Sequence, residues 1–220
     1  MSDSETVAKL AEAISQAMPT LDETEQRIAV TLYRALAEGR PVEHQEIARS
    51  SGLNAAQVKE TLGGWPGVFR DDDERVVGFW GLALREMPHR FEVDGVGIYT
   101  WCAWDPLFIG PLLGKPARVE SRDPQTGETV SLMVTPEGIE DLSPEGAVVS
   151  FLMPDEPWDH DVIQGFCHYV LFFASRESGQ QWLTKHPGTF LVSVDDAFEV
   201  GRRTNAVQFG ASQARLASSA

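Results

Sequence analysis

The chain has 220 residues, of which 42% are hydrophobic and 23% are charged, a composition typical of a folded domain rather than of a disordered segment. Its 33 acidic and 18 basic residues give a formal net charge of −15, which disfavours binding to the phosphate backbone of nucleic acids. The longest apolar runs, such as residues 169–174, are too short to cross a bilayer, and the polar, acidic residues 1–5 do not resemble a secretory signal. We therefore expect a cytoplasmic protein that binds neither nucleic acid nor a membrane.

Residues 1–85 are predicted to form a winged-helix-like, mainly helical domain. Apolar residues recur at helical spacing in two early segments, and residues 44–62 carry the small residue, turn glycine and apolar position of a helix-turn-helix. Residues 68–80 predict a two-stranded wing around an acidic turn. Because residues 71–73 of that turn are all aspartates, we interpret the domain as a packing module rather than as a DNA reader.

Residues 86–210 are predicted to form an α+β domain, with a mostly antiparallel sheet and flanking helices. Alternating and apolar runs bounded by turn residues predict strands at residues 91–93, 98–100, 117–121, 129–134, 147–153, 168–174 and 190–194. Helical patterns are expected at residues 101–114, 177–185 and 196–209. Residues 211–220 are small and polar, and we expect them to form a flexible tail.

The two cysteines are the first candidates for chemistry. A chain with only Cys102 and Cys167 has neither a disulfide scaffold nor a four-cysteine zinc site. Cys102 is expected where a strand meets a helical turn, with Asp105 three positions later on the same face. A helix dipole there can lower the pKa of the thiol, whereas an ionised carboxylate raises it, so the pair is suited to sharing a proton.

Each candidate residue could also have a packing role without taking part in chemistry. Cys167 precedes a very apolar segment, and a buried, unreactive thiol is the common state of a free cysteine. Trp101, next to Cys102, either lines a pocket or packs within a strand. Trp80 is expected to be a core anchor, and His160 is expected to be a solvated loop residue rather than a metal ligand.

From Phe91 to about Gly201 the sequence resembles the bacterial organomercurial lyase (alkylmercury lyase) family. The similar segments include residues 99–105 (Tyr-Thr-Trp-Cys-Ala-Trp-Asp), 166–168 (Phe-Cys-His), 172–175 (Phe-Phe-Ala-Ser) and 192–198 (Val-Ser-Val-Asp-Asp-Ala-Phe). The resemblance implies that Cys102, Asp105 and Cys167 are the catalytic and mercury-binding residues. Some family members have further cysteines at two positions that are Asp123 and His168 in this chain.

The reaction implied by the resemblance is protonolysis of a carbon–mercury bond, which gives a hydrocarbon and Hg(II). Mercury is a soft metal, and thiolates are the soft ligands of proteins. In this hypothesis Cys102 captures the organomercury compound, Cys167 becomes the second sulfur ligand, and Asp105 accepts a thiol proton and returns it to the leaving carbon. Mercury would then pass to a low-molecular-weight thiol or to a mercuric reductase. No organic cofactor is implied.

Two other functions compete with this hypothesis. A non-catalytic soft-metal binder or metallochaperone would use both cysteines but has no evident need for Asp105. A metal-responsive transcriptional regulator would place the helix-turn-helix on DNA, and the 10 basic against 15 acidic residues within residues 1–90 weigh against it.

Overall fold

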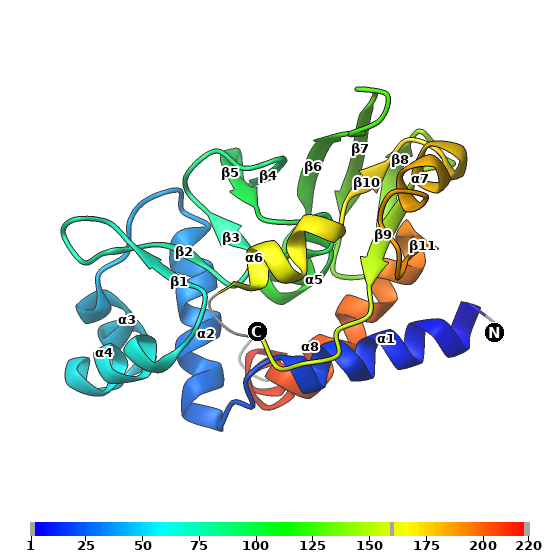
Figure 1. The fold of residues 1–220 in the computed structure, drawn as a ribbon. Helices are drawn as coiled ribbons and strands as arrows, with labels where there is room; N and C mark the ends of the chain where they lie inside the picture. Colours follow the sequence, from blue (N-terminus) through cyan, green and yellow to red (C-terminus); the bar gives the residue numbers. More distant parts are fainter. Residues whose placement is uncertain (1–2, 159–160, 218–220) are drawn as a thin grey trace.

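The structure, a computed structural model, describes residues 3–158 and 161–217 as a mixture of helices and antiparallel strands (Figure 1). The helices are α1 (Asp3–Ala17), α2 (Glu23–Leu36), α3 (His44–Ser51), α4 (Ala55–Gly64), α5 (Asp105–Leu113), α6 (Val162–Gly165), α7 (Arg176–Leu183) and α8 (Val194–Ala217), with a 3-10 turn, η1, at Cys167–Tyr169. The strands are β1 (Val68–Arg70), β2 (Val76–Phe79), β3 (Leu82–Ala83), β4 (His89–Val93), β5 (Val96–Thr100), β6 (Ala117–Arg122), β7 (Thr129–Val134), β8 (Ile139–Ser143), β9 (Val148–Leu152), β10 (Phe172–Phe173) and β11 (Thr189–Ser193).

The described strands form two sheets in which every pairing is antiparallel. The larger sheet has the order β1-β2-β3-β5-β4-β6-β7-β8, and the smaller has the order β10-β9-β11. The prediction of helices combined with a mostly antiparallel sheet is confirmed. The larger sheet continues through the expected boundary at residue 85, because Leu82 of β3 pairs with Thr100 of β5. This pairing does not decide whether residues 1–85 and 86–210 are separate domains, so that division stays a prediction.

Helices α1, α2 and α8 share one hydrophobic core with the larger sheet and with α5. In Figure 1, α1 and α8 lie side by side below the sheets, and the Gln208 side chain donates to the Ser15 carbonyl at 3.2 Å. The ring of Tyr33 in α2 contacts those of Phe79, Phe108 and Phe209, which belong to β2, α5 and α8. The first and last helices thus pack on the same central elements.

Helix α5 is placed inside this core by its composition. The helix is apolar on all sides, as expected of a buried helix, and Pro106 lies in its first turn, where a missing N–H is tolerated. It ends at Gly114, which has a φ of 70°. This geometry carries Asp105, the first residue of the helix, into the interior.

Several segments differ from the sequence prediction: β3 and α6 were not predicted, and the helix expected from residue 101 begins at Asp105. Residues 168–174 form η1 and the two-residue strand β10 instead of one strand, because the Ser150 hydroxyl donates to the Tyr169 carbonyl and accepts from the Leu171 N–H. Strand β8 was not predicted, since its residues lack an alternating apolar pattern. Residues 211–217, where we expected a flexible tail, continue α8, while residues 218–220 lie outside the described part of the chain.

None of the described helices combines the length and the apolar character that a membrane span requires.

Candidate active site

Cys102, Asp105 and Cys167 lie together in the interior. The sulfur atoms of both cysteines and one carboxylate oxygen of Asp105 are all within 4.8 Å of one another. The exposed fractions of the three residues are 0%, 4% and 5%, respectively. The structure thus brings together the three residues that the sequence singled out, although Cys167 is remote from the other two along the chain.

The Cys102–Asp105 half of the site is organised by the turn between β5 and α5. The Asp105 carboxylate accepts a hydrogen bond from the Cys102 backbone N–H at 2.6 Å, so the side chain folds back over the turn. The Thr100 hydroxyl donates to the Cys102 carbonyl at 3.4 Å. Because these contacts join residues close in the chain, the three-residue spacing of Cys102 and Asp105 was enough to predict that their side chains lie together.

The Cys167 half is attached to this turn through the backbone. The Ala103 N–H donates to the Val170 carbonyl at 2.9 Å, and the Val170 N–H donates to the Cys167 carbonyl at 3.1 Å. Cys167 is the first residue of η1, so the 3-10 turn that replaces the predicted strand sets the direction of its side chain. A thiol hydrogen bond joins Cys102 and Cys167.

Burial dominates the ionisation of the site. It raises the pKa of Cys102 well above its usual value, and the hydrogen bond to Cys167 and the charge of Asp105 act in the same direction. Of the two opposing effects considered for this thiol, the raising effect of the carboxylate is found, whereas no net lowering by a helix dipole results: Cys102 precedes the first residue of α5 by three positions and has no exposed surface. For Cys167, the hydrogen bond from Cys102 lowers the pKa, but burial and the charge of Asp105 outweigh it and leave the pKa raised.

Asp105 is the group that can exchange a proton near neutral pH. Burial raises its pKa to about 7, against the opposing effect of hydrogen bonds from Cys102. The resting site therefore holds two protonated thiols beside a carboxyl group that is balanced between its two ionisation states. Such a group can accept a proton and later deliver it.

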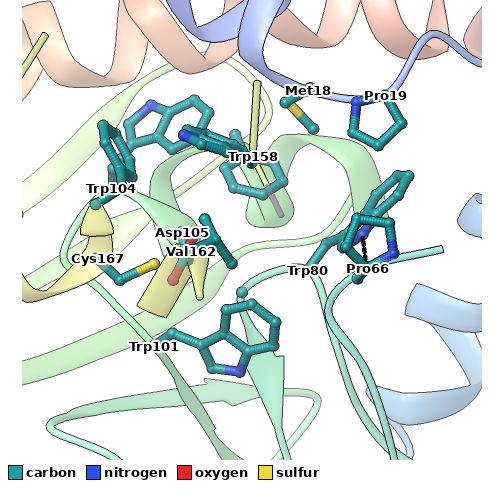
Figure 2. A pocket seen from close by; sticks show the side chains of 13 residues that line it. Met18, Pro19, Pro66, Trp80, Trp101, Trp104, Asp105, Trp158, Val162 and Cys167 are labelled. Carbon is teal, nitrogen blue, oxygen red and sulfur yellow. Dashed lines mark hydrogen bonds between the residues drawn. The ribbon is translucent and has the colours of Figure 1, made fainter. Parts of the chain in front are cut away.

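A narrow, largely apolar cavity of about 40 Å³ opens onto the site (Figure 2). Cys167 and Asp105 line it, and Figure 2 shows the Cys167 sulfur beside the Asp105 carboxyl. Cys102 is not among the lining residues. The aromatic walls are formed by Trp80, Trp101, Trp104, Phe108, Trp158 and Phe166.

Trp101 lines this cavity, which is the first of the two alternatives that the sequence left open. Trp80 both packs on Trp65 and Phe79, as expected of a core anchor, and faces the cavity, which the sequence did not indicate. The contribution of Trp158 was also missed, because the cavity is assembled from loops that are far apart in the chain. The abundance of tryptophan, with six in the chain, was the only signal available.

The two positions that hold further cysteines in some family members do not join the site. The buried carboxylate of Asp123 accepts hydrogen bonds from the backbone N–H groups of Gln125, Thr126 and Ala174, at 2.7, 3.2 and 2.9 Å, and so closes the β6–β7 turn. His168 is exposed and its ring contacts that of Tyr169 edge-on. His160 lies outside the described residues.

Fold and site together define a class of protein: an α+β protein with two buried thiols and a carboxyl group, the ligand set of a soft metal, beside an apolar cavity. The sequence profile of the alkylmercury lyase family matches residues 82–205. Alkylmercury lyases from Staphylococcus epidermidis and Pseudomonas putida are each 42% identical to the chain, over 175 and 172 residues. These alignments cover 80% and 78% of this chain and 80% of each relative.

A solved structure, the crystal structure of the mercury-bound form of MerB2, has a similar fold. Its TM-score is 0.72 at 21% identity, with 92% of this chain and 98% of that chain covered. The chain belongs to the alkylmercury lyase family. It is an organomercurial lyase, an enzyme that cleaves carbon–mercury bonds, and the metallochaperone alternative is not favoured.

Proposed function

We propose that this lyase cleaves its substrate by protonolysis at Cys102, Asp105 and Cys167, without an organic cofactor. The observation that carries the proposal is the convergence of two sulfur atoms and one carboxylate oxygen within 4.8 Å. Two thiolates on one mercury push electron density toward the carbon, and a nearby acid can protonate that carbon. The two cysteines and Asp105 would supply both, and their burial would keep bulk water from the reacting atoms.

The first step is capture of the substrate, written here as an organomercury–thiol adduct, RHg–SR′. Because Cys167 lines the cavity and Cys102 lies behind it, we propose that Cys167 bonds to mercury first, which reverses the order inferred from the sequence. The Hg–SR′ bond breaks as the Cys167 S–Hg bond forms. The displaced thiolate leaves with the Cys167 proton as R′SH.

The second step breaks the carbon–mercury bond. Asp105, as the carboxylate, accepts the proton of Cys102, whose sulfur becomes the second ligand of mercury. The protonated Asp105 then donates this proton to the carbon, which keeps the electron pair of the C–Hg bond and leaves as RH. Hg(II) stays on two thiolates and the carboxylate is restored, so the net change is RHgSR′ plus two thiols to RH, protein-bound Hg(II) and R′SH.

The fate of the product follows from its ligands. Free thiols compete for soft metals, so a low-molecular-weight thiol or the cysteines of a mercuric reductase would remove Hg(II) from the site. Cys102 and Cys167 must both stay reduced for a further cycle, which supports a cytoplasmic location, where thiols are kept reduced.

The winged-helix-like arrangement is proposed for α2, α3, α4 and the β1–β2 hairpin. The hairpin turn is closed by Asp71, which accepts from the Arg75 backbone and side chain. Its aspartates would repel phosphate, whereas α2 buries one face against the core. These features support a packing role for this unit.

The proposed function is tested by the release of benzene from phenylmercury in the presence of excess thiol. Cys102→Ser, Cys167→Ser and Asp105→Asn are each expected to stay folded and to lose at least about 100-fold in rate. His168→Ala is the matched control, because His168 adjoins Cys167 but points out to solvent. Release at the wild-type rate by any of the three site variants would contradict the proposal.

A further inference from the structure

The turn between β2 and β3 has an unusual backbone. Phe79 pairs with Leu82, so the turn consists only of Trp80 and Gly81, and their φ values are 30° and 96°. Positive φ is common for glycine but rare for a residue as bulky as tryptophan. Strained residues of this kind persist where the surrounding structure holds them, and they are concentrated at functional sites.

Gly81 faces the carboxyl group of Asp105. A Cβ atom at Gly81 would lie 2.6 Å from both Cγ and Oδ1 of Asp105, a separation that non-bonded carbon and oxygen atoms do not tolerate. The backbone of Gly81 is therefore the surface on which the carboxyl group rests. The Gly81 carbonyl also accepts from the Trp101 N–H at 2.9 Å, which ties the turn to the residue before Cys102.

Tyr33 holds the other half of the turn. Its ring is fully buried in the core, and its hydroxyl donates to the Trp80 carbonyl at 2.8 Å. The indole N–H of Trp80 donates to the Pro66 carbonyl at 2.7 Å, the bond drawn as a dashed line in Figure 2. The strained residue is thus fixed through its carbonyl and through its side chain, by contacts from two separate segments.

We propose that the Trp80–Gly81 turn, fixed by Tyr33, is a positioning element that sets the Asp105 carboxyl group against the two thiols. Gly81 and Tyr33 are positioning residues in this account: Gly81 supports the Asp105 carboxyl group through its backbone alone, and Tyr33 acts through the Trp80 carbonyl. The inference rests on the proposed function, because it assumes that Asp105 transfers the proton. It also gives the N-terminal helices a part in the reaction, since Tyr33 belongs to α2.

The chain offers a matched control for the test. The β4–β5 turn, Asp94–Gly95, also has two residues of positive φ, 52° and 77°, between the paired residues Val93 and Val96. A Cβ atom at Gly95 meets nothing within 4 Å. Gly81→Ala and Gly95→Ala therefore introduce the same kind of backbone strain, but only Gly81→Ala displaces Asp105.

The experiment compares kcat and KM for benzene release from phenylmercury in wild type, Gly81→Ala and Gly95→Ala. The number of intact sites in each sample is measured from the ultraviolet absorbance of Hg(II) bound by two thiolates. Each rate is divided by this number, so that a loss of folded protein does not lower the kcat. For Gly81→Ala we expect kcat to fall about 10- to 100-fold with KM changed less than about 3-fold, because misplacing a catalytic group by about 1 Å has effects of this size. For Gly95→Ala, both constants should stay within about 2-fold of wild type.

Tyr33→Phe keeps the ring and removes the hydroxyl, so it tests the same inference if Gly81→Ala does not fold. Its kcat should fall about 3- to 10-fold with KM unchanged, as expected when one positioning hydrogen bond is lost.

Equal kcat in Gly81→Ala and Gly95→Ala overturns the inference. If Gly81→Ala is unfolded, a wild-type kcat in Tyr33→Phe overturns it. Asp105→Asn distinguishes failure of the proposed function from failure of this inference. If Asp105→Asn releases benzene at the wild-type rate, the proposed function fails. If Asp105→Asn is inactive and Gly81→Ala has the wild-type kcat, only the positioning role of the turn is excluded.

Discussion

The backbone N–H of Cys102 donates a 2.6 Å hydrogen bond to the carboxylate of Asp105, three residues further on. This bond holds the carboxyl group beside the thiol and favours its ionised form, while burial favours the neutral form. Burial has the larger effect, so the pKa of Asp105 is raised to about 7. This balance determines how the rate and the stability of the enzyme should depend on pH.

The rate should rise with pH through neutrality. Asp105 must be ionised to accept the proton of Cys102, and its pKa of about 7 means that the ionised fraction grows between about pH 6 and pH 8. We expect kcat/KM for phenylmercury, measured at constant excess thiol, to increase over this range. His168→Ala should keep the same profile, which would exclude that histidine as the titrating group. A profile that is flat or falling between pH 6 and pH 8 would contradict the assignment.

Asp105→Asn should stabilise the fold above neutral pH. In the unfolded chain the carboxyl ionises near the ordinary aspartate pKa of 3.8, but in the fold it stays protonated up to about pH 7. The unfolded state thus binds fewer protons between these values, so the free energy of unfolding of the wild type falls as pH rises through this window. Asparagine avoids this penalty, which is at most about 4 kcal/mol.

Urea unfolding of wild type and Asp105→Asn at pH 5 and pH 8 measures this effect. The advantage of the variant should be larger at pH 8 than at pH 5. An Asp105→Asn protein that is less stable than wild type at pH 8 would show that the carboxylate is stabilised in the fold rather than penalised.

Trp158 should matter more for aromatic than for small substrates. Its half-buried indole lines the cavity and packs on Phe166 with ring centroids 4.7 Å apart. Contact with a phenyl ring contributes about 1 kcal/mol, so Trp158→Ala should raise KM for phenylmercury about 5- to 10-fold. Methylmercury, which has no ring, is the internal control and its KM should change much less. Equal changes for both substrates would exclude Trp158 as a determinant of selectivity.

Asp123 should support stability rather than turnover. Burial raises the pKa of its carboxyl group, but hydrogen bonds from the Ser178 side chain and from three backbone N–H groups outweigh burial and leave the pKa below the usual value. Asp123→Ala leaves these donors unpaired, at an expected loss of about 2–4 kcal/mol in the free energy of unfolding. The kcat per folded molecule should be unchanged. In the wild type, the contribution of Asp123 is present above about pH 4 and is lost as pH falls through its lowered pKa.

The local half of the site could be predicted from the sequence, and the remote half could not. Cys102 and Asp105 are three residues apart, so one turn brings them together whatever surrounds it. The position of Cys167 depends on a 3-10 turn and on the Ala103–Val170 backbone bond, and only the resemblance to a family indicated it. Gly81 was missed because its importance lies in a contact with Asp105 across the fold.

The errors in the fold have similar origins. An apolar run such as residues 168–174 has the composition of a strand, but a side-chain hydroxyl of β9 interrupts its pairing. The alanine-containing end of α8 continues a helix already begun at Val194, and composition alone suggested a tail. The sequence left the direction of the Cys102 pKa shift open, because burial, the largest cause of that shift, is not visible in a sequence.

The central claim is that both thiols hold one mercury atom once the carbon–mercury bond is broken. The direct test is X-ray absorption at the mercury edge on protein that has reacted with one equivalent of phenylmercury and has then been freed of external thiol. We predict one benzene released for each protein and a mercury atom bound by two sulfurs, with a single protein sulfur in Cys102→Ser. Release of benzene from a wild-type protein whose mercury carries one sulfur or none would contradict the account.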